Sequence, residues 1–168
     1  MNLGFEYQGK VTVKIKKKGK ITRVYSGKNS GLPPLFHGIC NYLAYGAVGI
    51  NNDYLPNYMT LLSTDSSGDY SDILQYRSIV TRHKPEKDVD SGVWNTTITA
   101  VVMNSQVSGT STATAIGICG VSTTNDVDYL LATISANSLI DTNGNPWDGK
   151  IPSDSAIIID WSLYIGNK

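Results

Sequence analysis

The chain has 168 residues, which is enough for one domain with a sizeable hydrophobic core. Charged residues make up only 17 % of it, and 14 basic residues balance 14 acidic ones. This balance argues against both a strongly basic nucleic-acid-binding protein and a strongly acidic disordered one. Glutamate, a good helix former, occurs only as Glu6 and Glu86, whereas strand-favouring residues are frequent. The composition therefore predicts an all-β protein.

The zero net charge conceals a division along the chain. Residues 1–28 contain eight basic residues and one acidic residue, a net charge of +7, so the remainder carries −7. A segment of this kind can dock on something acidic, such as nucleic acid, a membrane or the body of a neighbouring copy. Its lysines can equally form a solvated face that protects an edge strand. The candidate partner-binding residues are Lys14, Lys16, Lys17, Lys18, Lys20 and Arg23.

The first predicted element is a β-hairpin. Residues 10–16 alternate strictly, with Val11, Val13 and Ile15 on one face, as in a half-buried strand. Residues 17–20 form a turn in which Gly19 supplies the unusual dihedral, and a return strand follows. We expect residues 1–28 to form a basic hairpin arm and residues 29–168 to form a single β-sandwich domain.

A linker rich in turn residues spans 26–34, and one short α-helix is predicted after it, over about residues 34–46. Apolar residues recur there at spacings of three and four, and Gly46 and Gly49 end the pattern. A single amphipathic helix needs a sheet to pack against.

The rest of the chain has the pattern of successive strands separated by turns. Candidate strands are 58–63, 73–83, 93–103, 112–122, 128–136 and 155–165. Strands at this spacing predict an antiparallel β-sandwich or a jelly-roll-like fold. The last strand is the most apolar, so we expect it to be central.

No catalytic constellation is found in the sequence. His37 and His83 have no partner at ligand spacing, and a zinc site built from them with Cys40 and Cys119 would need four residues that are scattered singly. Nucleophile-elbow and phosphate-binding glycine motifs are lacking, and no carboxylate pair stands out. We expect a protein that is not an enzyme, with no cofactor and no metal, whose two cysteines are buried thiols.

The segment 141–148 is the most ligand-like part of the sequence. Oxygen-bearing residues at every second position imitate the start of a calcium loop, but the glycine at its sixth position and the closing glutamate are missing. A plain turn is therefore favoured. We expect Trp147 to be exposed, and Trp94 and Trp161 to lie in the core. This makes a glycan-binding or subunit-interface loop possible, with candidate residues Asp141, Asn143, Asn145, Trp147 and Asp148.

Nucleic acid and membrane are not the expected partners. The basic hairpin lacks the interleaved aromatic residues that stack on single strands, and the acidic remainder would repel phosphate. No apolar run approaches membrane-spanning length, and residues 1–9 lack the pattern of a signal peptide. We expect folding in a cytoplasm.

Several short motifs together resemble virion proteins of tailed bacteriophages. The resemblance includes the charged hairpin at Lys18-Gly19-Lys20 and the apolar strand from Ile157 to Ile165 around Trp161. The intervening motifs are Lys28-Asn29-Ser30-Gly31, Leu35-Phe36, Asn41-Tyr42-Leu43-Ala44 and Pro56-Asn57-Tyr58-Met59. The pattern covers nearly the whole chain and carries no catalytic residues.

This resemblance implies a non-enzymatic structural protein of the virion, assembled in the host cytoplasm. A neck, tail or collar ring component is the expected role, with copies of itself and other virion proteins as partners. A head fibre, a capsid decoration protein or a carbohydrate-binding host-recognition module remains the alternative. The opposite charges of the two parts of the chain favour a head-to-tail contact between copies.

Overall fold

The computed structural model describes residues 5–29, 56–87, 93–109, 111–121 and 128–167. Within these ranges the chain is almost entirely β-strand, with two short 3-10 helices, η3 (Asn104–Gln106) and η4 (Ala136–Ser138). The all-β class is therefore confirmed. The helix predicted over residues 34–46 lies outside the described residues.

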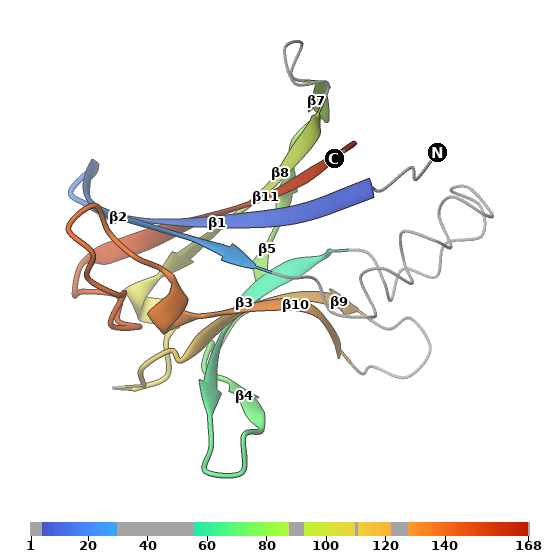
Figure 1. Ribbon diagram of the computed structural model, residues 1–168. Helices are drawn as coiled ribbons and strands as arrows, with labels where there is room; N and C mark the ends of the chain where they lie inside the picture. The colour runs from blue at the N-terminus through green and yellow to red at the C-terminus, as the bar shows by residue number, and fades with distance from the viewer. Residues whose placement is uncertain (1–4, 30–55, 88–92, 110, 122–127, 168) are drawn as a thin grey trace.

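Two antiparallel sheets pack face to face as a β-sandwich (Figure 1). Sheet A has the order β2-β1-β11-β8-β6, and β7 also pairs with β8. Its strands are β1 (Phe5–Lys17), β2 (Lys20–Asn29), β6 (Thr81–Arg82), β7 (Glu86–Lys87), β8 (Trp94–Met103) and β11 (Ser155–Asn167). Sheet B has the order β10-β9-β3-β4, and β5 also pairs with β3. Its strands are β3 (Tyr58–Thr64), β4 (Tyr70–Asp72), β5 (Ser78–Ile79), β9 (Ala115–Val121) and β10 (Asp128–Ser135).

The last strand is central, as predicted. β11 lies between β1 and β8, and it pairs with β1 along thirteen residues, from Phe5 opposite Asn167 to Lys17 opposite Ser155. Strands that pair on both edges satisfy all their backbone groups within the sheet, so an apolar strand is most stable in this position. β11 and β1 together form the middle of sheet A.

The predicted hairpin is present, but it is not an arm that extends from the domain. β1 and β2 are joined by a two-residue turn in which Lys18 and Gly19 have φ angles of 48° and 80°. Two-residue hairpin turns of type I′ have a positive φ angle at both of these positions. Because β1 also pairs with β11 and buries Val11, Val13 and Ile15, the hairpin is an integral part of sheet A.

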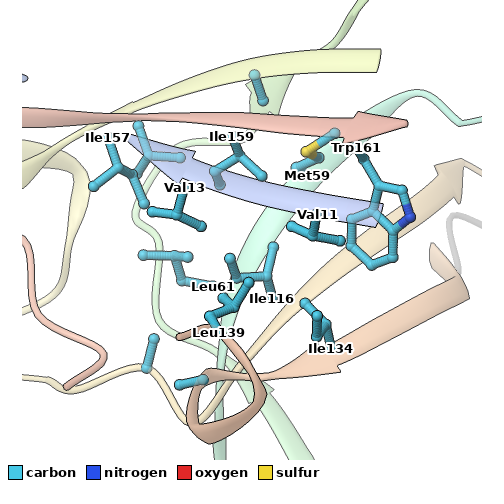
Figure 2. Packing of buried hydrophobic residues seen from close by; sticks show 14 of the residues in the cluster. Val11, Val13, Met59, Leu61, Ile116, Ile134, Leu139, Ile157, Ile159 and Trp161 are labelled. Carbon is cyan, nitrogen blue, oxygen red and sulfur yellow. The ribbon is translucent and has the colours of Figure 1, made fainter. Parts of the chain in front are cut away.

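Inward-facing and outward-facing side chains alternate along β1 and β11, and the inward-facing ones form the part of the core that sheet A supplies. Every second side chain of β11 (Ile157, Ile159 and Trp161) points toward sheet B with Val11 and Val13 beside it (Figure 2). Side chains from sheet B and from the segment after η4 meet them, including Met59, Leu61, Ile116, Ile134 and Leu139. The intervening residues of β1 and β11 therefore line the outer face of sheet A.

The segment predicted as one strand over residues 73–83 is broken. β5 pairs with β3 in sheet B, whereas β6 pairs with β8 in sheet A, so the chain passes from one sheet to the other between Ile79 and Thr81. The amide of Val80 donates a hydrogen bond to the carbonyl of Asn57 at this crossing. A change of sheet needs a bend, and the apolar pattern alone does not reveal one.

The free edge of β2 is partly covered. Ser26 exchanges two backbone hydrogen bonds with Ile140, of 2.9 and 3.0 Å. A β-carbon on Gly27 would come within 2.3 Å of the carbonyl oxygen of Ser138, so only glycine allows this approach. The segment after η4 is thereby fixed against the hairpin.

Candidate interaction surfaces

The predicted cations do not form one surface. Lys17, Lys18 and Lys20 are exposed at the turn between β1 and β2, and these three residues are called the lysine tip below. Lys16 is exposed on the outer face of sheet A. Lys14 is half-buried on the same face, where its Nζ lies 2.6 Å from Oδ2 of Asp160.

Arg23 is engaged within its own chain. A hydrogen bond with the Tyr25 side chain raises the pKa of the guanidinium, and the charges of Asp148 and Asp141 act in the same direction. The structure thus places Arg23 beside the segment 141–148, which the sequence suggested as a separate candidate site. Arg23 is therefore paired with Tyr25 on its own strand and is not part of the lysine tip.

Two features of the lysine tip lower the stability of the β1–β2 hairpin. Lys17 lies directly opposite Lys20 in the β1–β2 register, and like charges in that position destabilise a sheet. Lys18 has a positive φ angle of 48°, which Asn or Gly adopts more readily. A turn under selection for stability alone would not concentrate lysines here.

An acidic hairpin lies far from the lysine tip. The connection between β3 and β4 contains Asp65 and Asp69, and Asp72 ends β4; these three residues with the exposed Tyr70 are called the acidic hairpin. Every residue from Thr64 to Asp72 is exposed. Figure 1 shows this hairpin projecting away from sheet A at the bottom of the view, whereas the turn between β1 and β2 lies at the end of sheet A.

The Asp141 loop is a turn, as the sequence favoured. Oδ1 of Asp141 accepts hydrogen bonds from the amides of Asn143 and Asn145, both 2.8 Å, and the Asn145 side chain donates to Oδ2. The carboxylate of Asp65 accepts two amides of the acidic hairpin in the same way, and Gly144 and Gly68 both have positive φ. The two loops share the pattern Asp-x-x-Gly followed by Asp or Asn. In both, the first aspartate stabilises the turn by accepting backbone amides.

Those hydrogen bonds change the acidity of Asp141. The amide of Asn145 is the largest cause that lowers the pKa of this carboxyl below its ordinary value of 3.8, with further contributions from Asn143 and from the charge of Arg23. Donors that point at a carboxylate favour its ionised form. The negative charge of Asp141 therefore stabilises the loop.

The expectation that Trp147 is exposed is wrong. Its side chain is fully buried in the core cluster, and its Nε1 donates a hydrogen bond to the carbonyl of Lys150. The amide of Trp147 also bonds the carbonyl of Leu139, so the two residues form the stem of a small excursion whose tip is the Asp141 loop. The tip is exposed, but the stem points inward, which leaves no aromatic ring there for a sugar to stack on.

Of the two tryptophans predicted to lie in the core, one is buried and the other is exposed. Trp161 is in the core, as predicted, whereas Trp94 at the start of β8 is 52 % exposed. Cys119 is a buried free thiol, and Cys40 lies outside the described residues. Trp94 therefore supplies exposed aromatic surface on sheet A.

A polar trough runs over the outer face of sheet A, and the sequence did not predict it. Its volume is about 430 Å³. Its floor consists of short side chains from the central strands, namely Thr12, Thr97, Thr99, Asp160 and Ser162. Long side chains form the walls: Lys10 and Lys14 stand on β1, and His83, Lys84 and Glu86 lie in and beside β6 and β7. Short residues between long ones hollow an otherwise flat sheet.

The floor of the trough is ordered by hydrogen bonds. Asp160 joins Lys14 to Thr99, whose hydroxyl donates to Oδ1 at 2.7 Å, and Nε2 of His83 lies 3.0 Å from the same hydroxyl. Beside this row the hydroxyls of Thr97 and Ser162 are 2.9 Å apart. These groups are held in place before any ligand arrives, and each hydroxyl retains further hydrogen-bonding capacity.

Among the described residues, no three His, Cys, Asp or Glu side chains lie together in a way that could hold a metal ion. None of the described helical segments has the length and hydropathy needed to cross a membrane.

Comparison of the chain with protein-family models, with curated proteins and with solved structures finds no match. Functional proposals for this protein therefore depend on the surfaces described above and on the motifs of the sequence.

Replacement of Trp147 by alanine distinguishes a core role from a surface role. We expect Trp147→Ala to lower the free energy of unfolding by about 3–5 kcal/mol, because a large buried ring is removed. Trp94→Ala, at an exposed ring, is the matched control and should cost far less. Urea denaturation of both variants measures this; equal and small losses would contradict the burial of Trp147.

The pH dependence of stability tests the Asp141 loop. Because the folded-state pKa of Asp141 is depressed, its contribution is present above the unfolded value of 3.8 and is lost as pH falls through the lower folded value. Asp141→Asn keeps an acceptor oxygen but cannot titrate, so we expect its stability to fall less steeply than that of the wild type below about pH 4. Thermal unfolding across this range measures the difference, and superimposable profiles would contradict it.

Proposed function

We propose that this protein is a non-enzymatic structural subunit of a bacteriophage virion, a neck, tail or collar ring component, that assembles through contacts between copies. The observation that carries the proposal is the separation of the lysine tip from the acidic hairpin on one folded domain. The resemblance of the hairpin, the Pro56-Asn57-Tyr58-Met59 motif and the last strand to tailed-phage virion proteins supports the virion as the setting.

Two distant surfaces of opposite charge favour a heterologous contact. A copy that places its acidic hairpin on the lysine tip of the next leaves its own tip available to a third copy. Such a contact closes into a ring when the rotation between copies permits it. A contact between two lysine tips, or between two acidic hairpins, would instead place like charges together.

The destabilising features of the lysine tip also support a contact with an acidic partner. The Lys17–Lys20 pair and the positive φ of Lys18 lower the stability of the isolated chain. An acidic partner would relieve the repulsion between the lysines. Tyr70, which is 48 % exposed between Asp69 and Asp72, supplies the aromatic surface that interfaces favour.

Charge exchange tests the contact. The tip variant carries Lys17→Glu, Lys18→Asn and Lys20→Glu; the hairpin variant carries Asp65→Asn, Asp69→Lys and Asp72→Asn. The asparagines at 65 and 72 retain the acceptors that the Ser67 and Leu74 amides use. Each exposed ion pair contributes about 0.2–1 kcal/mol, so we expect either variant alone to self-associate roughly 3-fold to 100-fold more weakly than the wild type.

Mixing the two variants supplies the decisive comparison. The tip variant then has two acidic ends and the hairpin variant has two basic ends, so we expect the mixture to associate more tightly than either variant alone. Sedimentation velocity at low and high salt measures this, with Lys150→Glu, an exposed position outside both surfaces, as the control. A wild-type chain that stays monomeric and is absent from purified particles of the phage encoding it would contradict the proposed function.

A further inference from the structure

The trough on the outer face of sheet A has the features of a ligand-binding site rather than of a bare sheet face. Its floor contains four hydroxyl side chains and one carboxylate, and all five are partly buried. Prearranged polar groups in a concavity fix the orientation of a ligand at little entropic cost. The trough is separate from both the lysine tip and the acidic hairpin, so it is not needed for the proposed contact between copies.

The floor groups repeat at a spacing set by the sheet. In the register, Ser26, Thr12, Asp160 and Thr99 lie in one row across four neighbouring strands, and Thr12 lies 3.3 Å from Ser26 through their hydroxyls. A second row contains Lys28, Lys10, Ser162 and Thr97. Neighbouring strands are about 4.8 Å apart, which is close to the length of one sugar residue in an extended glycan chain. Ser26 and Lys28 lie beyond the trough, so within it the rows offer successive sugars a polar group on each of three neighbouring strands, β1, β11 and β8.

The charges of the trough favour an acidic sugar over a neutral one. Lys14 is neutralised by Asp160, whereas Lys10 has no ion-pair partner in the part of the chain that the structure describes. Lys10 also lies directly opposite Lys28, a like-charge pair that a carboxylate would relieve. Nucleic acid is disfavoured because the lining of the trough offers one tyrosine, Tyr164, and not the series of aromatic rings on which successive bases stack.

We propose that the outer face of sheet A binds an acidic oligosaccharide that runs across the strands. Its hydroxyls bond the floor groups Thr12, Thr97, Thr99, Asp160 and Ser162, and a carboxylate pairs with Lys10. The Tyr164 side chain at the same face supplies an aromatic surface. This site replaces the Asp141–Asp148 loop as the place on the molecule where a glycan fits.

Titration calorimetry of the full chain tests the site with three acidic probes: oligomers of galacturonic acid, of mannuronic acid and of sialic acid. Methyl-esterified galacturonate oligomers are the uncharged counterpart. We expect saturable binding of at least one acidic probe, weaker binding of the ester, and weaker binding as salt increases. Absence of saturable binding by all three acidic probes, or equally tight binding of a single-stranded oligonucleotide, would overturn the proposal.

Variants separate recognition from general attraction by lysines. We expect Lys10→Gln to weaken binding about tenfold, as loss of a charged hydrogen bond does, and Lys20→Gln, the same change at the lysine tip, to leave it unchanged. The double variant Thr97→Val, Ser162→Ala removes both members of a hydrogen-bonded hydroxyl pair. Neither hydroxyl is then left without its partner, so we expect the fold to be kept. This double variant should also weaken binding; equal losses for Lys10→Gln and Lys20→Gln with no effect of the double variant would contradict the site.

Discussion

The pairing of β1 with β11 along thirteen residues determines how both the core and the outer face of sheet A are built. It joins strands from opposite ends of the described chain into the middle of sheet A, and its register decides which side chains face inward. Val13 and Ile159 reach the core, while Thr12 and Asp160 reach the outer face. A slip by one residue would exchange the two sets, because strand side chains alternate with a period of two.

The same register therefore builds the core and the trough together. Burial of Ile157, Ile159 and Trp161 excludes a slip of β11 by one residue, and the Lys14–Asp160 ion pair marks the observed alignment on the outer side. Stability comes mainly from the inner face, where apolar area is removed from water. The outer face of sheet A, the lysine tip and the acidic hairpin bury little apolar area, so their residues are available for recognition.

Much of the fold follows from local patterns. Strict alternation at residues 10–16 and glycine in the Lys18-Gly19 turn predict the first hairpin, and the apolar run around Trp161 predicts a central strand. The side on which a loop residue points does not follow from such patterns. Trp147 is buried because its amide bonds Leu139 across a small excursion, and Trp94 is exposed because β8 begins beyond the core. Both depend on tertiary contacts that a single sequence does not encode locally.

The trough could not be predicted for a related reason. Thr97, Thr99, Asp160 and Ser162 alternate with apolar neighbours, so each strand alone indicates an outward polar face. Only the cross-strand register shows that these short residues adjoin one another between longer ones. Nothing in the sequence sets Asp65, Asp69 and Asp72 apart from other turn residues, because their distance from the lysine tip is a property of the fold.

If copies meet through the lysine tip and the acidic hairpin, a carbodiimide should cross-link the lysines of one copy to the carboxylates of the next. A mixture of unlabelled and ¹⁵N-labelled protein distinguishes links between copies from links within one copy, and the 2.6 Å Lys14–Asp160 pair serves as the internal reference. We expect mixed-isotope links that join Lys17, Lys18 or Lys20 to Asp65, Asp69 or Asp72. Intermolecular links confined to other residues, with the Lys14–Asp160 link present, would contradict it.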